Sequence, residues 1–128
     1  MESKNVEIVM ALGCNVNQFA HIGQANGLLR ELFGDIVFSE AVWTDPVGLD
    51  SDRFVNQVAV ARTPLPLEAV QTALKKVEAL CGRTVMDKAR GIIAMDIDLL
   101  AYNGKRYKEE DWQRDYIRRL LDSLHYVI

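Results

Sequence analysis

Residues 92–102, which read IIAMDIDLLAY, are the stretch that decides the fold. Apolar residues dominate it and isoleucine recurs, which predicts a β-strand over Ile92–Tyr102. Asp96 and Asp98 lie two residues apart, so both carboxylates would project from one face of that strand. The other face would carry three apolar side chains, those of Met95, Ile97 and Leu99, and we expect helices to cover it.

The two aspartates can be interpreted as a functional site or as ordinary surface residues of a strand. Neighbouring carboxylates in apolar surroundings repel each other and are unfavourable to bury, and a divalent cation between them removes both problems. Ligands that are all oxygen favour Mg²⁺, which also holds waters and phosphates. The alternative is an exposed polar face of an amphipathic strand, the commoner meaning of an isolated D-x-D. Residues 92–95 are all apolar, and Arg83, Arg90 and Gly91 lie just upstream, which favours the metal interpretation.

Composition indicates one globular domain over residues 1–128. The chain is 49% hydrophobic and 26% charged, and its formal net charge of −3 argues against a general nucleic-acid surface. No apolar run approaches the length of a membrane helix. Cys14 and Cys81 are far apart and lack metal-binding spacing, so we expect reduced thiols in a cytoplasmic protein. We expect this protein to be a monomer or a weak homodimer.

The patterns along the chain predict the order β-α-β-β-α-β. This is the order of a ferredoxin-like α+β fold, an antiparallel or mixed sheet with two helices packed on one face, here with a C-terminal helical extension. The first and fourth strands are expected to lie centrally, and loops, a ligand or a partner would cover the other face. The predicted segments are a strand over Val6–Leu12, a helix capped by Asn17 and ending near Phe33, strands over Ile36–Trp43 and Phe54–Ala61, a helix from Leu67 to Cys81 closed by Gly82, a polar loop over Thr84–Gly91, the Ile92–Tyr102 strand, a turn at Asn103–Gly104, and a segment over Tyr107–Ile128 that suits a helix but could begin extended.

Several other side chains are candidates for a site. Phe54 and Asn56 share a strand face and could form a slot for a flat polar heterocycle, although a core phenylalanine and a turn-facing amide are the simpler interpretation. Glu78 could meet a ribose hydroxyl or only water. Arg83 and Arg90 could meet phosphate or belong to a solvated loop. We interpret Cys14 as a packing residue.

Six short motifs, taken in order, resemble the 6-hydroxymethyl-7,8-dihydropterin pyrophosphokinases of folate biosynthesis. Each motif is weak alone, but the ordered set spans most of the chain and is specific. The motifs are ALGCN at 11–15, WTDPVG at 43–48, FVNQV at 54–58, EALCGR at 78–83, MDIDLL at 95–100 and RDYI at 114–117.

The resemblance implies a reaction and a site. ATP and the pterin would be the substrates, and the pterin hydroxymethyl oxygen would attack the β-phosphorus of ATP, giving the pterin diphosphate and AMP. The implied roles are Mg²⁺ binding (two ions) by Asp96 and Asp98, stacking on the pterin by Phe54 and Tyr116, hydrogen bonding to its edge by Asn56, Thr44 and the backbone near Val47, contact with the ribose by Glu78, and contact with phosphates by Arg83 and Arg114.

The chain departs from this family at arginine positions. The family has R-x-R after its glycine, where this chain has Arg83-Thr84-Val85, and W-G-P-R before the aspartates, where this chain has Arg90-Gly91-Ile92-Ile93. Arg90 is the candidate to replace one missing guanidinium in catalysis. The P-H-P segment is absent, and Cys14 stands at a serine position. Two alternatives therefore stay open: a non-catalytic or weakly active pterin- and nucleotide-binding protein, and an interaction module that pairs through its sheet.

Overall fold

A single antiparallel sheet forms the centre of the protein. The computed structural model describes residues 5–46 and 51–127. The strand order is β2-β4-β1-β5-β6, with β3 beside β4, and the described pairings are all antiparallel. The strands are β1 (Val6–Cys14), β2 (Asp35–Phe38), β3 (Val42–Thr44), β4 (Phe54–Thr63), β5 (Asp96–Tyr102) and β6 (Lys105–Arg106).

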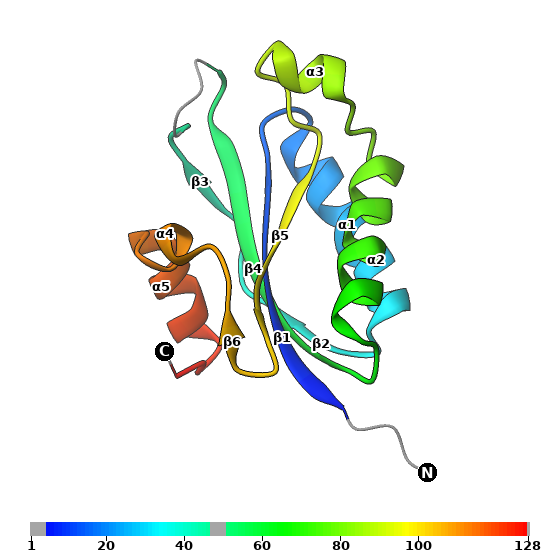
Figure 1. The fold of residues 1–128 in the computed structure, drawn as a ribbon. Helices are drawn as coiled ribbons and strands as arrows, with labels where there is room; N and C mark the ends of the chain where they lie inside the picture. The colour runs from blue at the N-terminus through cyan, green and yellow to red at the C-terminus, as the bar shows by residue number, and fades with distance from the viewer. Residues whose placement is uncertain (1–4, 47–50, 128) are drawn as a thin grey trace.

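Helices cover both faces of this sheet (Figure 1). α1 (Gln18–Leu32) and α2 (Leu67–Leu80) pack side by side on one face, and α4 (Glu109–Trp112) and α5 (Asp115–Ser123) lie on the other. A short helix, α3 (Val85–Ala89), lies at one end of the molecule. The predicted ferredoxin-like α+β fold with a C-terminal helical extension is confirmed.

The larger core lies between the sheet and helices α1 and α2. On α2 the side chains of Val70, Leu74 and Val77 are spaced four and three residues apart and are at most 3% exposed, as the helical period requires. Gly82 follows the helix with φ of 98°, a conformation that glycine adopts without steric penalty. The apolar pattern thus fixes both the length and the buried face of α2.

A second core lies on the opposite face, where sequence alone left loops, a ligand or a partner as the cover. Trp112, Ile117 and Leu121 from α4 and α5 are at most 1% exposed and pack against Val9 and Leu100 of the sheet. Tyr116 and Ile117 lie in α5, so the chain is helical there and not extended. The protein therefore covers this face with its own C-terminal segment.

Two predicted strands are shorter than expected because side chains replace strand pairing. The predicted 36–43 strand is interrupted after Phe38, where the Ser39 hydroxyl accepts a hydrogen bond from the Val58 N–H at 3.0 Å. The predicted 92–102 strand begins only at Asp96. Before it, Asn15 accepts from the Ile93 N–H and donates to the Gly91 carbonyl, both at 2.7 Å.

Three further expectations need correction. Residues 84–91 are not all loop, because the Thr84 side chain accepts from the Asp87 N–H at 3.0 Å and begins α3. Asn17 precedes α1 but makes no capping hydrogen bond with its side chain, since its backbone is left-handed with φ of 43°. The fourth predicted strand, which is β5, is expected from the sequence to be central in the sheet. It has a neighbouring strand on both sides only at its end, because β6 pairs only with Ala101 and Tyr102 of β5.

Candidate active site

A cavity of about 190 Å³ opens where β1, β4 and β5 lie side by side at one end of the sheet. The register pairs Gly13 of β1 with Asn56 of β4 on one side and with Asp96 of β5 on the other. A Cβ atom on Gly13 would lie 2.5 Å from Asn56 Oδ1, far inside contact distance. The lack of a side chain at position 13 therefore makes room for the Asn56 amide.

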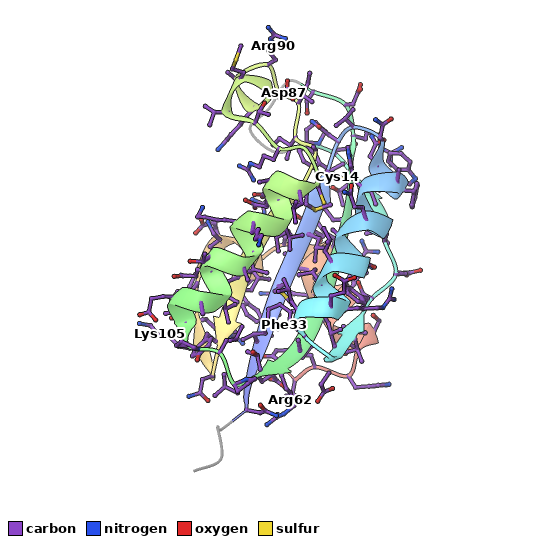
Figure 2. The ribbon with its side chains drawn as sticks, turned by 90° about the vertical axis from the view of Figure 1, so that its right-hand side faces the viewer. Cys14, Phe33, Arg62, Asp87, Arg90 and Lys105 are labelled. Carbon is purple, nitrogen blue, oxygen red and sulfur yellow. The ribbon has the colours of Figure 1, made fainter. Side chains whose placement is uncertain are left out.

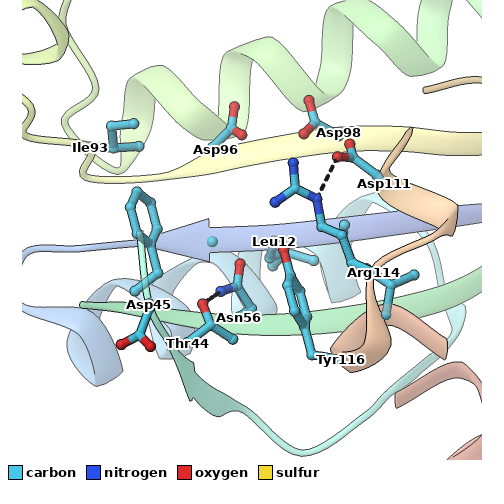
Figure 3. A pocket seen from close by; sticks show the side chains of 14 residues that line it. Leu12, Thr44, Asp45, Asn56, Ile93, Asp96, Asp98, Asp111, Arg114 and Tyr116 are labelled. Atoms are coloured by element: carbon cyan, nitrogen blue, oxygen red, sulfur yellow. Dashed lines mark hydrogen bonds and ion pairs between the residues drawn. The ribbon is translucent and has the colours of Figure 1, made fainter. Parts of the chain in front are cut away.

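Two aromatic rings and an amide face this space, which we call the aromatic cavity. Phe54 and Asn56 are both half-buried on one face of β4, and Tyr116 comes from α5. The Asn56 Nδ2 donates a hydrogen bond to Thr44 Oγ1 on β3, which fixes the orientation of the amide. In Figure 3 this pair and Tyr116 lie on one side of the cavity, and Asp96 and Asp98 lie on the other.

The two carboxylates share a face of β5, as the D-x-D spacing predicts. Burial, reinforced by the charge of Asp96, raises the pKa of Asp98 from 3.8 to about 6, although Lys108 opposes the shift. Each aspartate has one cationic neighbour: Arg83 lies 2.6 Å from an Asp96 oxygen, and Lys108 lies 3.7 Å from an Asp98 oxygen. The two carboxylates thus repel each other, and nearby cations stabilise their ionised forms.

The same carboxylates line a second hollow of about 780 Å³ on the α2 side, which we call the helix-side cleft. Asp96 and Asp98 are the residues common to both hollows and form their shared wall. The cleft is otherwise rich in cations and has an apolar floor. Its other lining residues are Gln71, Leu74, Lys75, Glu78, Arg83, Lys88, Ile97, Leu99, Tyr107 and Lys108.

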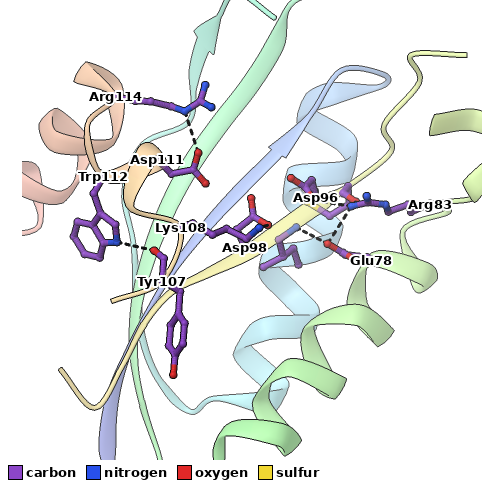
Figure 4. A network of polar contacts seen from close by, with 11 residues as sticks. Glu78, Arg83, Asp96, Asp98, Tyr107, Lys108, Asp111, Trp112 and Arg114 are labelled. Atoms are coloured by element: carbon purple, nitrogen blue, oxygen red, sulfur yellow. Dashed lines mark hydrogen bonds and ion pairs between the residues drawn. The ribbon is translucent and has the colours of Figure 1, made fainter. Parts of the chain in front are cut away.

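Glu78 connects α2 to this wall (Figure 4). Its carboxylate is buried, accepts a hydrogen bond from the Ile97 N–H at 2.7 Å and ion-pairs with Arg83 at 3.2 Å. Burial raises the pKa of Glu78, while the Ile97 N–H and Arg83 favour its ionised form. Glu78 and Asp96 together hold the Arg83 guanidinium at the mouth of the cleft.

Comparison with protein families decides the classification. The family model for 7,8-dihydro-6-hydroxymethylpterin-pyrophosphokinase matches residues 9–125, nearly the whole chain. The chain belongs to this family. The resemblance carried by the six ordered motifs is confirmed. A comparison with curated proteins found no match.

Most of the residues expected from the pyrophosphokinase motifs lie at the two hollows. Thr44, Phe54, Asn56, Asp96, Asp98, Arg114 and Tyr116 line the aromatic cavity, and Glu78 and Arg83 line the helix-side cleft. Arg90 lines neither and lies at the outer end of the molecule beyond α3 (Figure 2). Val47 lies outside the described residues. The roles of these residues in binding pterin, ATP or metal stay predictions.

Sequence reasoning missed several charged residues that line the two hollows. Asp111 lines the aromatic cavity and binds the Arg114 guanidinium at 3.0 Å, a pairing that its spacing of three residues could have suggested. Lys75, Lys88 and Lys108 line the cleft. No local pattern marks Lys108, because its approach to Asp98 depends on tertiary packing.

Cys14 is fully buried, as expected of a packing residue. Its thiol donates a hydrogen bond to the Gln18 carbonyl at 3.3 Å. Burial, together with the neighbouring Cys81, raises the pKa of the Cys14 thiol to about 12, so the thiol stays protonated at neutral pH.

No helix among the described residues is long and apolar enough to cross a membrane.

Proposed function

We propose that this pterin pyrophosphokinase family member transfers the diphosphate of ATP to 6-hydroxymethyl-7,8-dihydropterin, giving the pterin diphosphate and AMP. The observation that carries the proposal is the shared wall: one carboxylate pair borders both a small aromatic cavity and a large cationic cleft. A transfer between two substrates requires such an arrangement, since the reacting groups must meet in line at one place.

The aromatic cavity suits the pterin. The ring would stack between Phe54 and Tyr116, and the Asn56 amide, oriented by Thr44, would pair with donors and acceptors on its edge. In this pose the hydroxymethyl group would point toward Asp96 and Asp98. The predicted contact near Val47 would complete recognition of the pterin edge.

The helix-side cleft suits ATP. Its apolar floor would accept the base, and Arg83, together with the cavity residue Arg114, would bind phosphate oxygens. Glu78 would contact the ribose or orient Arg83. Arg83 also ion-pairs with Glu78, which is not a proposed metal ligand, so Glu78 would keep the guanidinium in the cleft when Asp96 binds the metal.

The carboxylate pair fits Mg²⁺. Burial and the charge of Asp96 disfavour ionised Asp98, which a cation at the pair would relieve, and the described residues contain no cluster of three or more acidic, histidine or cysteine side chains that could hold a metal alone. Asp96 and Asp98 would therefore supply two oxygen ligands, and water and phosphate oxygens would complete the shell, the arrangement Mg²⁺ favours. Mg²⁺ held there would neutralise charge on the transferred diphosphate. We propose that Asp96 and Asp98 would hold two such ions, which would supply charge neutralisation for the phosphates of ATP.

An enzymatic assay tests the proposal. Purified protein is incubated with ATP, Mg²⁺ and 6-hydroxymethyl-7,8-dihydropterin, and products are separated by liquid chromatography with mass detection. We expect AMP and pterin diphosphate in equal amounts, with at least a hundredfold loss in an Asp96→Asn variant, because removing a ligand of the phosphate-bridging metal removes transition-state charge stabilisation. A folded sample that forms no AMP would rule the activity out.

A binding protein is the second candidate, favoured by the outer position of Arg90 and by Val85, which is 86% exposed at a position where the family has arginine. Calorimetry with the pterin and a nonhydrolysable ATP analogue separates the two functions. Pterin binding without AMP formation supports this second candidate.

A further inference from the structure

Lys108 is a cation of the site that the pyrophosphokinase motifs do not include. Its ammonium nitrogen lies 3.7 Å from an Asp98 oxygen, it lines the helix-side cleft, and half of its side chain is exposed. It is the counterpart of Arg83, which neutralises Asp96. The two carboxylates are thus each matched by one cation from a different part of the chain (Figure 4).

The backbone at Lys108 is held in an unfavourable conformation. Its φ of 54° places a lysine in the left-handed region, where glycine or asparagine would be less strained. The flanking segment is firmly anchored: the Tyr107 N–H donates to the Leu100 carbonyl at 2.9 Å, and the buried Trp112 indole donates to the Tyr107 carbonyl at 3.0 Å. This rigid support aims the Lys108 side chain at the wall of the cleft.

We propose that Lys108 is a phosphate-binding residue that changes partner when the metal–nucleotide complex arrives. This inference rests on the proposed function. In the free protein the ammonium group neutralises Asp98. When that carboxylate becomes a metal ligand, Lys108 faces a divalent cation and must move away. The nearest anions are then the nucleotide phosphates in the same cleft, which the flexible, half-exposed side chain can reach.

Charge in the cleft favours this exchange over simple release to water. Lys75, Lys88 and Arg83 line the same hollow, so a polyphosphate entering it meets four cations in all. Lys108 differs from the other two lysines because it starts in contact with a metal-binding carboxylate. It therefore couples occupation of Asp98 to capture of phosphate.

The test compares three variants: Lys108→Met, Lys108→Arg and, as a matched control, Lys105→Met. Lys105 is exposed in β6, three residues before Lys108, and lines neither hollow. Calorimetry measures the Kd of α,β-methylene-ATP with saturating Mg²⁺. We expect Lys108→Met to weaken binding about tenfold, the loss of one exposed charge-assisted bond, Lys108→Arg to restore it to within about threefold, and Lys105→Met to match the original protein.

A second measurement separates exchange from structural support. Binding of Mn²⁺ alone, followed by electron paramagnetic resonance, should tighten about two- to fivefold, roughly the strength of an exposed ion pair, in Lys108→Met because a competing cation is gone. A damaged fold would weaken the binding of both Mn²⁺ and the nucleotide. Unchanged nucleotide affinity, or equal or weaker Mn²⁺ binding, in this variant overturns the inference and leaves the proposed function standing. Failure of the original protein to bind the nucleotide overturns both.

Discussion

At the scale of single residues, Asp98 is a proposed metal ligand, but its ionised carboxylate destabilises the ligand-free folded protein. Its pKa is about 6 in the folded protein against 3.8 for a free side chain. The folded state therefore binds the proton more tightly than the unfolded state. Stability contributed by this group is present below about pH 4, falls as pH rises from about 4 to 6, and stays lost at neutral pH.

The variant Asp98→Asn should for this reason be more stable and inactive. We expect the free energy of unfolding at about pH 7.5 to rise by about 1–2 kcal/mol, less than the pKa shift alone implies because the side chain is partly exposed and loses Lys108. The gain should shrink toward about pH 4. Urea unfolding at several pH values measures it, and turnover with ATP and pterin measures the loss of activity.

Asp122→Asn on the exposed side of α5 is the control and should change neither property. An Asp98→Asn variant that is less stable than the original at neutral pH would contradict the assigned electrostatic penalty.

Gly13 limits what the aromatic cavity can hold. In Gly13→Ala the new Cβ would lie 2.5 Å from Asn56 Oδ1, so the amide must shift from its present place and its hydrogen bond to Thr44 would be disturbed. We expect pterin affinity to fall about tenfold, because a recognition hydrogen bond is lost or misplaced, as measured by calorimetry. Gly27→Ala in α1 is the control: nothing lies within 4 Å of the place a Cβ would take there, and alanine should stabilise the helix by about 0.5–1 kcal/mol. Equal pterin affinity in both variants would show that Asn56 has room to adjust.

At the scale of elements, Asn15 joins the end of β1 to the segment before β5. Its side chain is 4% exposed and makes hydrogen bonds to Gly91 and Ile93, which lie more than seventy residues along the chain. Asn15→Ala would leave the buried Ile93 N–H without its partner. We expect a loss of about 2–4 kcal/mol in the free energy of unfolding, measured with urea.

The matched control is Asn5→Ala, since Asn5 is exposed just before β1 and lines neither hollow. It should change stability by less than about 0.5 kcal/mol. Similar losses in the two variants would mean that water can replace the Asn15 amide.

Helices and strands whose apolar residues recur at the helical or strand spacing could be predicted from sequence. Segments whose backbone conformation depends on side chains distant in the sequence could not. The spacing of Val70, Leu74 and Val77 decides α2 without reference to the rest of the chain. By contrast, residues 92–95 are as apolar as a strand, but their backbone partner is the Asn15 amide. Only the folded chain brings that amide close.

The same distinction holds within the site. Alternation along a strand places Phe54 with Asn56, and Asp96 with Asp98, on shared faces, and the structure has both pairs as expected. The position of Lys108 depends on where Trp112 anchors the following segment, and that is a property of the second core. No local pattern carries this information.

At the scale of the whole molecule, both cores stabilise the fold, but only the α4–α5 core also packs against Tyr116 of the candidate site. The α1–α2 core contains Leu29, and the α4–α5 core contains Leu121, both fully buried. Truncation of either to alanine should lower the free energy of unfolding by about 2–5 kcal/mol. Only Leu121→Ala should also weaken pterin binding, because α5 carries Tyr116 and follows Arg114.

Calorimetry below the unfolding transition, on samples shown to be folded by circular dichroism, measures this difference. If Leu29→Ala reduced pterin affinity as much as Leu121→Ala, the second core would have no special part in positioning Tyr116 and Arg114.

The sheet edge at the site has one more consequence. Along its first half β5 has β1 on one side and, in the described chain, no strand on the other, so its backbone would be open to any extended chain that approached. Glu78 takes the Ile97 N–H there, and Tyr107 and Trp112 take the Leu100 carbonyl. With these two groups occupied, an approaching strand would find fewer backbone partners along this part of β5, although the candidate site lies open beside it.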